Sequence, residues 1–255
     1  MRTASVFLLF LAVFFAASGY ASGEEPSPYR RYMDAVARDS GVDSVEYSFS
    51  LEYRGDKDAS PMKMAIRDKV KAVFENGVTV ANEKVRFTIV TRSGEMPLST
   101  RSTSWYRDGY EYMSRHMFRG TKTKKAVPPP SINFWPEQGI VPFMVFPEEY
   151  LAEQHEDGVT LSFTLDPAVM TSHFRETSGK IEQLTASVDA VLNDDGTVRK
   201  ATATGTFRRV AAPDAVQRYT AVFEIGQRGN IAITYPDDLD SYTESPPLES
   251  SRNAP

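Results

Sequence analysis

Residues 188–207 read VDAVLNDDGTVRKATATGTF. Apolar and polar residues alternate from Leu184 to Leu192, Asp194-Asp195-Gly196 provides a turn, and a second run of β-forming residues extends from Val198 to Phe207. Side chains with a period of two line one face of a strand. This stretch therefore predicts two long antiparallel strands that share an apolar face.

The same period recurs along most of the chain. It predicts strands over 45–53, 85–89, 159–165 and 219–225, and over 62–74, where Asp68 interrupts the apolar pattern. Asn76-Gly77 and Asp108-Gly109 are hairpin signals, because a type I′ turn requires positive φ at both central residues. The pattern is typical of long hairpins rather than of parallel βαβ units.

Two segments predict helices instead. Ser27-Pro28 is a capping residue followed by proline at the first helical position, and an apolar face with helical spacing runs from Tyr29 to Ala37 before Gly41. Asp166-Pro167 starts a second short helix that extends through about Phe174 and is closed near Gly179. Long strands with one apolar face need a cover, and few helices are available. We therefore expect a mainly β (α+β) fold, in which a strongly curved antiparallel sheet, a half-barrel, wraps round a few short helices.

The N-terminus has the pattern of a secretory signal. Arg2 precedes an apolar run from Val6 to Ala17, and Gly19-Tyr20-Ala21 offers small residues at a cleavage site. We expect a signal peptide over 1–21, a single domain over 22–242 and a disordered tail over 243–255. The expected location is extracytoplasmic, either periplasmic or secreted, with no integral membrane span after cleavage.

Composition excludes several classes. The chain has no cysteine, so a disulfide framework and a lipid anchor on cysteine are both excluded. A net charge of −5 does not suggest a nucleic-acid partner. His116, His155 and His173 lack metal-binding spacing, and no nucleophile, phosphate-loop or dinucleotide motif is present. We expect no enzyme activity, metal or cofactor, although a pair of carboxylates brought together by the fold stays possible at this point.

Residues 126–150, AVPPPSINFWPEQGIVPFMVFPEEY, are unusually apolar for an irregular segment. The prolines interrupt any regular helix or strand, and so many exposed aromatic side chains would favour aggregation. Trp135 should therefore be buried. The stretch either fills the concave face of the sheet permanently or lines a site for an apolar ligand. The candidate lining residues are Ile132, Phe134, Trp135, Phe143, Met144, Phe146 and Tyr150.

A basic run precedes this stretch. Lys122, Lys124 and Lys125 are candidates for contact with anionic head groups at the mouth of a cavity, and a solvated loop is the alternative. Asn193-Asp194-Asp195-Gly196 is similar to part of a calcium loop, but it lacks the distal acid, so a plain turn is expected.

Three segments resemble an uncharacterised group of bacterial envelope proteins in the LolA-like lipoprotein-carrier superfamily. They are WYRDGYEYM (105–113), the stretch 188–207 quoted above, and ITYPDDLDSY (233–242). The resemblance implies a half-barrel with an apolar cavity on its concave side. Relatives often carry a lipid anchor on cysteine, which this chain lacks.

The expected function is non-enzymatic binding of an apolar ligand, a lipid or an acylated peptide, in the concave face. The alternative is an envelope interaction or stress-sensor protein with a permanently filled cavity, which would bind an envelope protein partner on another surface.

Overall fold

The structure, a computed structural model, describes residues 26–39, 42–55, 63–75, 78–90, 98–116, 120–126, 146, 148–178 and 181–244. Within these residues the helices are α2 (Pro28–Asp39) and α3 (Pro167–Ser178), with single 3-10 turns η2 (Glu148–Tyr150) and η3 (Leu239–Ser241). The strands are β1 (Ser44–Gly55), β2 (Lys63–Glu75), β3 (Val78–Val90), β4 (Leu98–Arg107), β5 (Tyr110–His116), β6 (Thr121–Ala126), β7 (Leu151–Asp157), β8 (Thr160–Leu165), β9 (Ile181–Leu184), β10 (Ser187–Leu192), β11 (Val198–Arg209), β12 (Ala212–Arg228) and β13 (Thr243–Glu244). The predicted signal peptide lies outside the described residues.

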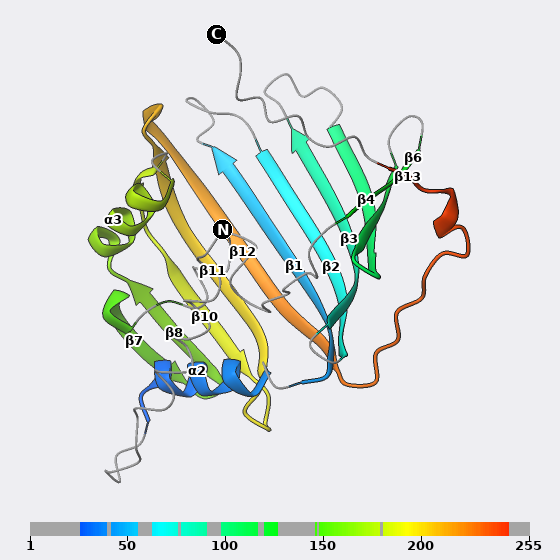
Figure 1. Ribbon diagram of the computed structural model, residues 1–255. Coiled ribbons are helices and arrows are strands. Elements are labelled where there is room, and N and C mark those ends of the chain that lie inside the picture. Colours follow the sequence, from blue (N-terminus) through cyan, green and yellow to red (C-terminus); the bar gives the residue numbers. More distant parts are fainter. Residues whose placement is uncertain are drawn as a thin grey trace.

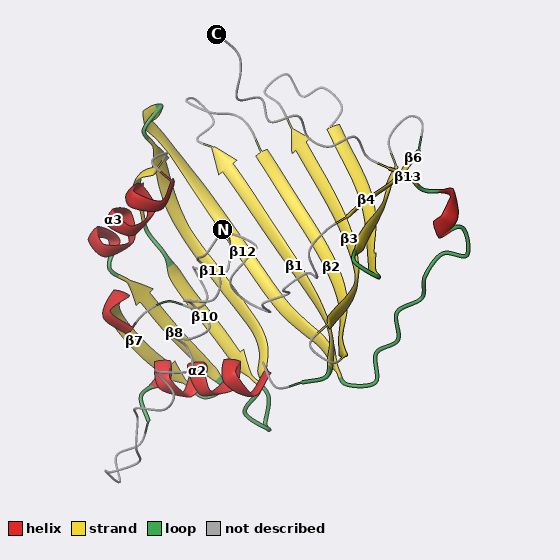
Figure 2. Cartoon of the chain, in the orientation of Figure 1, coloured by secondary structure: helices red, strands yellow, loops and turns green. Residues whose placement is uncertain are grey.

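All thirteen described strands join one curved sheet, in the order β13-β6-β5-β4-β3-β2-β1-β12-β11-β10-β8-β7, with β9 pairing to β11 (Figures 1 and 2). Every pairing is antiparallel except the short one between β13 and β6. Among the described strands no pairing joins β7 to β13, so the sheet stays open. The predicted mainly β fold with a curved antiparallel sheet is confirmed.

The helices occupy one part of this sheet. Helix α2 packs on β7, β8, β10 and β11, and α3 packs beside β9 (Figure 1). Both begin with the predicted caps. The Ser27 hydroxyl accepts the Arg30 amide at 3.3 Å, and an Asp166 carboxylate oxygen accepts the Ala168 amide at 2.7 Å. Helix α3 ends at Ser178, directly before the Gly179 that was expected to close it.

The Asp108-Gly109 hairpin is confirmed. Asp108 has φ 52° and Gly109 has φ 78°, the pair of positive values that a type I′ turn requires. Arg107 and Tyr110 close the turn as the first pair of the β4–β5 ladder. The turn at 194–196 also forms, and Gly196 has φ 76°. The Asn76-Gly77 signal falls outside the described residues.

Asp68 interrupts the apolar pattern of β2 but not the strand itself. Strand β2 continues through this residue, which is buried and lies opposite Phe49 of β1. The ladder with β1 on one side and β3 on the other runs without a register shift past Asp68. Backbone pairing on both sides therefore keeps the strand continuous through a charged side chain that interrupts the apolar pattern.

The long strand predicted over 184–192 is divided into β9 and β10 at Thr185 and Ala186. The register with β11 is the same on both sides, since Leu184 pairs with Phe207 and Ser187 with Thr204. At the division the Thr185 carbonyl oxygen accepts a hydrogen bond from the Tyr219 hydroxyl at 2.8 Å. Tyr219 belongs to β12, which is separated from β9 and β10 by β11. Its hydroxyl thus takes the place of a backbone amide as the donor to the Thr185 carbonyl oxygen.

The ordered chain also extends past the predicted boundary at Tyr242. Thr243 and Glu244, expected in a disordered tail, form β13 beside Thr123 and Lys124 of β6. Residues 245–255 lie outside the described part of the chain.

Candidate functional site

One row of cross-strand partners defines the face of the sheet that α2 covers. Phe163 of β8, Val188 of β10, Ala203 of β11, Ala221 of β12 and Leu51 of β1 follow one another in register, and all are buried. Directly opposed residues share a face, and Tyr32 of α2 packs on Phe163 with ring centroids 5.5 Å apart. We call this side the inner face.

Aromatic side chains spread across the inner face of β1, β11 and β12. Tyr47 lies 5.2 Å from Phe223, Tyr53 meets Phe207 edge-on at 5.6 Å, and Phe207 lies 6.3 Å from Tyr219, all between ring centroids. We call this set the aromatic floor: Tyr47, Phe49, Tyr53, Phe207, Tyr219 and Phe223. Its members are buried except Tyr53, which is half-buried near the C-terminal end of β1.

A second aromatic group lies beneath α2. Phe146 stacks on Tyr29 with centroids 4.9 Å apart and meets Phe163 edge-on at 6.1 Å. The Tyr29 hydroxyl donates a hydrogen bond to the Phe146 carbonyl oxygen. Burial raises the pKa of both Tyr29 and Tyr32, so both phenols stay neutral at physiological pH. Phe146 is therefore held in place by the stacking of its ring and by the hydrogen bond to its carbonyl oxygen.

Of the seven candidate lining residues, the structure describes two. Phe146 is buried, and Tyr150 is half-buried in η2, where its carbonyl oxygen accepts the Asp166 amide at 2.8 Å. Element η2 is a single 3-10 turn directly before β7. Ile132, Phe134, Trp135, Phe143 and Met144 lie outside the described residues.

The three candidate lysines lie in strand β6 rather than in a solvated loop. Successive side chains of a strand point to opposite faces, so the three lysines are divided between the two faces of the sheet. Lys122 pairs with Asp238, and the Lys124 ammonium lies 5.8 Å from the Tyr110 ring centroid, both on the outer face. Lys125 points to the inner face, where its ammonium lies 2.7 Å from a Glu111 carboxylate oxygen. The three lysines therefore do not form one basic patch.

Glu111 is the center of a polar group that sequence reasoning missed. Its carboxylate is almost fully buried on the inner face of β5 and accepts hydrogen bonds from the Ser104 hydroxyl at 3.1 Å and the Tyr106 hydroxyl at 3.4 Å. With Lys125 beside it, the negative charge is balanced. The inner face is thus apolar over β1, β11 and β12 and polar toward β4, β5 and β6.

The outer face of β4 to β6 is covered by the chain that follows β12. The Trp105 indole donates to the Thr234 carbonyl oxygen at 3.1 Å, and Tyr112 meets Tyr242 edge-on at 5.7 Å. In Figure 1 this segment, coloured orange to red, runs from the end of β12 to β13 at the edge of β6. Through β13 this segment pairs with the edge of β6 along two residues.

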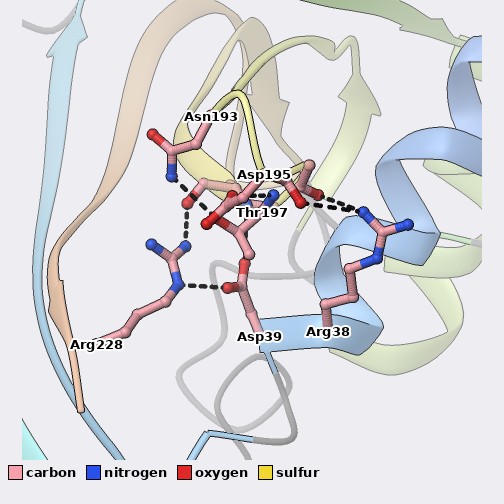
Figure 3. Close-up of polar contacts among 8 residues, drawn as sticks. Arg38, Asp39, Asn193, Asp195, Thr197 and Arg228 are labelled. Atoms are coloured by element: carbon pink, nitrogen blue, oxygen red, sulfur yellow. Dashed lines mark hydrogen bonds and ion pairs between the residues drawn. The ribbon is translucent and has the colours of Figure 1, made fainter.

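Polar contacts fix α2 to the sheet (Figure 3). The buried Asp39 carboxylate accepts the Arg228 Nε at 2.6 Å and the Val198 amide at 3.0 Å. Arg228 also donates to the Val198 carbonyl oxygen. We call Asp39, Val198 and Arg228 the helix anchor, because they join the end of α2 to β11 and β12.

The turn at 193–197 is a plain turn. The Asp195 carboxylate accepts the Thr197 hydroxyl at 2.6 Å and the Thr197 amide at 2.9 Å, and these bonds lower the pKa of Asp195. Arg38 reaches the carbonyl oxygens of Asp195 and Gly196 (Figure 3). Within the described ranges, no group of three or more His, Cys, Asp or Glu side chains is placed to hold a metal ion.

His116 and His155 are exposed.

The described helices include none that is long and apolar enough to cross a membrane.

No family model and no curated protein matches this sequence. Among solved structures the chain is similar to the ywiB protein from Bacillus subtilis, at 6% identity and TM-score 0.21, over 74% of this chain and 99% of that one. A DUF1329 family protein from Desulfovibrio piger matches at 10% identity and TM-score 0.27, over 82% and 96%. A β-barrel-like DUF1849 protein from Brucella abortus matches at 12% and 0.22, over 73% and 100%. These TM-scores are too low to indicate a shared function, and the fold rests on the strand pairing described above.

Proposed function

We propose that this chain is an exported, non-enzymatic half-barrel of the LolA-like kind that binds an apolar ligand, a lipid or an acylated peptide, on its inner face. The observation that supports this proposal is the aromatic floor. Pockets for apolar ligands are lined mainly by aromatic and aliphatic side chains with a few polar groups placed at one side. The floor and the polar group around Glu111 have this distribution on one continuous face.

One end of the floor is less buried than the rest. Tyr53 and Ile66 are half-buried, whereas the members of the floor nearer the middle of the sheet are buried. The described helices pack toward β7–β11, at the opposite side of the sheet from β2. A ligand entering beside Tyr53 would reach the floor at its half-buried end, away from α2, and would replace the protein atoms that now bury the rest of the floor.

Native mass spectrometry tests this proposal directly. Protein purified gently from two different expression hosts should carry an additional small-molecule mass that is lost on denaturation. Tyr53→Glu should abolish the adduct, because it places a charge on the floor. Arg54→Glu is the matched control, since Arg54 is exposed on the outer face of the same strand. A clean protein mass in both hosts would contradict ligand binding.

A second candidate, an envelope interaction or stress-sensor protein with a filled interior, is favoured by Phe146. This residue lies within the apolar stretch 126–150 and is 3% exposed, in close contact with Tyr29 and Phe163. An interior filled in this way would leave function to an outer surface. A clean mass combined with specific capture of an envelope protein by the folded chain would support this candidate.

A further inference from the structure

Arg209 lies at the half-buried end of the aromatic floor, beside Tyr53 and Phe207. The register of β11 shifts between Phe207 and Arg209 on the side of β12, and between Arg208 and Arg209 on the side of β9. Such irregularities redirect side chains and are frequent beside binding sites. Here the guanidinium carbon of Arg209 lies 5.7 Å from the centroid of the Phe207 ring. The cation is therefore held against the floor.

The charge of Arg209 also reaches Tyr53. Burial raises the pKa of the Tyr53 hydroxyl, and the nearby positive charge of Arg209 opposes that rise. The phenol therefore stays protonated and can donate a hydrogen bond. Phe207, Tyr53 and Arg209 thus bring together an apolar surface, a neutral donor and a cation.

Arg209 differs from the other basic residues near the inner face. Arg54 and Arg67, at the same end of the sheet, both lie near Glu52, at 3.3 and 4.0 Å. Lys125 is paired with Glu111. Within the described part of the chain, no carboxylate lies within ion-pair distance of Arg209. Its guanidinium is exposed and can accept an anionic partner.

We propose that Arg209 selects the charge of the ligand, so that the inner face takes an anionic amphiphile. Its carboxylate or phosphate binds the guanidinium, which matches the planar geometry of either group. The Tyr53 hydroxyl donates a second hydrogen bond, and the alkyl chain lies on the aromatic floor. This inference rests on the proposed function, and it assigns the head group to Arg209 rather than to the lysines of β6.

The test compares probes with the same chain and different head groups. Binding of oleate, oleyl phosphate, oleyl alcohol and oleylamine to delipidated protein is measured below their aggregation concentrations. Wild type should bind the two anions about tenfold more tightly than the alcohol, and the amine most weakly. Comparing oleate with oleyl phosphate shows which anionic group fits better.

Two variants isolate the charge. Arg209→Gln should bind oleate about as weakly as wild type binds the alcohol. Arg208→Gln removes the same charge from the neighbouring exposed residue and should keep the preference for anions. Circular dichroism and thermal melting confirm that both variants are folded. Equal binding of all four probes, or an unchanged preference in Arg209→Gln, overturns the inference but leaves the proposed function intact. Absence of binding by every probe overturns the proposed function itself.

Discussion

The Nε atom of Arg228 lies 2.6 Å from the Asp39 carboxylate, although 189 positions separate the two residues in the chain. Asp39 is 1% exposed and is the last residue of α2. Asp39→Ala should therefore lower the free energy of unfolding by about 3 kcal/mol, because it leaves Arg228 and the Val198 amide without their acceptor. Urea unfolding measures the change.

Asp34→Ala is the control for this prediction, since Asp34 lies on the same helix and is not part of the helix anchor. Its effect should be within about 0.5 kcal/mol. Equal losses from both variants would show that the helix anchor does not fix α2.

Gly205 allows Tyr219 to reach Thr185. A methyl group built on Gly205 would lie 2.6 Å from the Tyr219 hydroxyl oxygen and closer still to the Thr185 carbonyl oxygen. Gly205→Ala should cost about 2 kcal/mol of stability, because the ring and its hydrogen bond must shift. Gly226→Ala, whose methyl group would lie 3.6 Å from the Glu46 carbonyl oxygen, should cost much less. Thermal melting compares the two, and similar losses would contradict this packing.

The β4–β5 turn requires glycine at position 109. Its φ of 78° disfavours a β-branched side chain, so Gly109→Val should lower the free energy of unfolding by about 1 kcal/mol or more. Asp108→Asn keeps a residue that tolerates positive φ and should leave stability nearly unchanged. A valine variant as stable as wild type would argue against this turn type in solution.

Buried tyrosines should make the fold sensitive to alkali. Burial raises the pKa of Tyr29, Tyr32 and Tyr219 in the folded state. Above about pH 10 the unfolded chain loses these protons while the folded chain keeps them, so stability falls as pH rises. Each tyrosine adds up to about 1.4 kcal/mol per pH unit. Urea unfolding between pH 9 and 11, a range set by the tyrosine reference value of about 10, measures this slope.

Two phenylalanine variants separate the contributions. Within the described residues the buried Tyr32 hydroxyl has no hydrogen-bond partner, so Tyr32→Phe should raise stability at neutral pH by about 1 kcal/mol and reduce the alkaline slope. Tyr219→Phe should also reduce the slope but lower stability, because its hydroxyl donates to Thr185. A stability loss in Tyr32→Phe would indicate a partner for its hydroxyl.

Strands with one buried face were predictable from sequence. In β1, Tyr47, Phe49 and Leu51 are buried while Ser48 is exposed, which is the alternation that the sequence displays. The helix caps at Ser27 and Asp166 and the turn at Asp108-Gly109 were equally readable. Each depends on a local backbone requirement that few residue types satisfy.

Edge strands were not predictable. Strand β7 has the sequence LAEQHED, and every residue after Leu151 is exposed, so no apolar period marks it. Strand β6 is similarly polar, and charged residues at sheet edges discourage association with other chains. The same lack of pattern concealed the inner-face pair of Lys125 and Glu111. Only the register of β5 and β6 reveals which lysine faces the interior.

Photoaffinity labelling shows directly whether an apolar ligand binds on the inner face. Delipidated protein is irradiated with a fatty acid that carries a diazirine in its chain, and the labelled residues are located by peptide mass spectrometry. Labels are expected on the aromatic floor, at Tyr53, Phe207 or Tyr219, and should disappear when excess oleate is added. Labels confined to the outer face around Trp105 and Tyr112, or no displaceable label on folded protein, would contradict binding on the inner face.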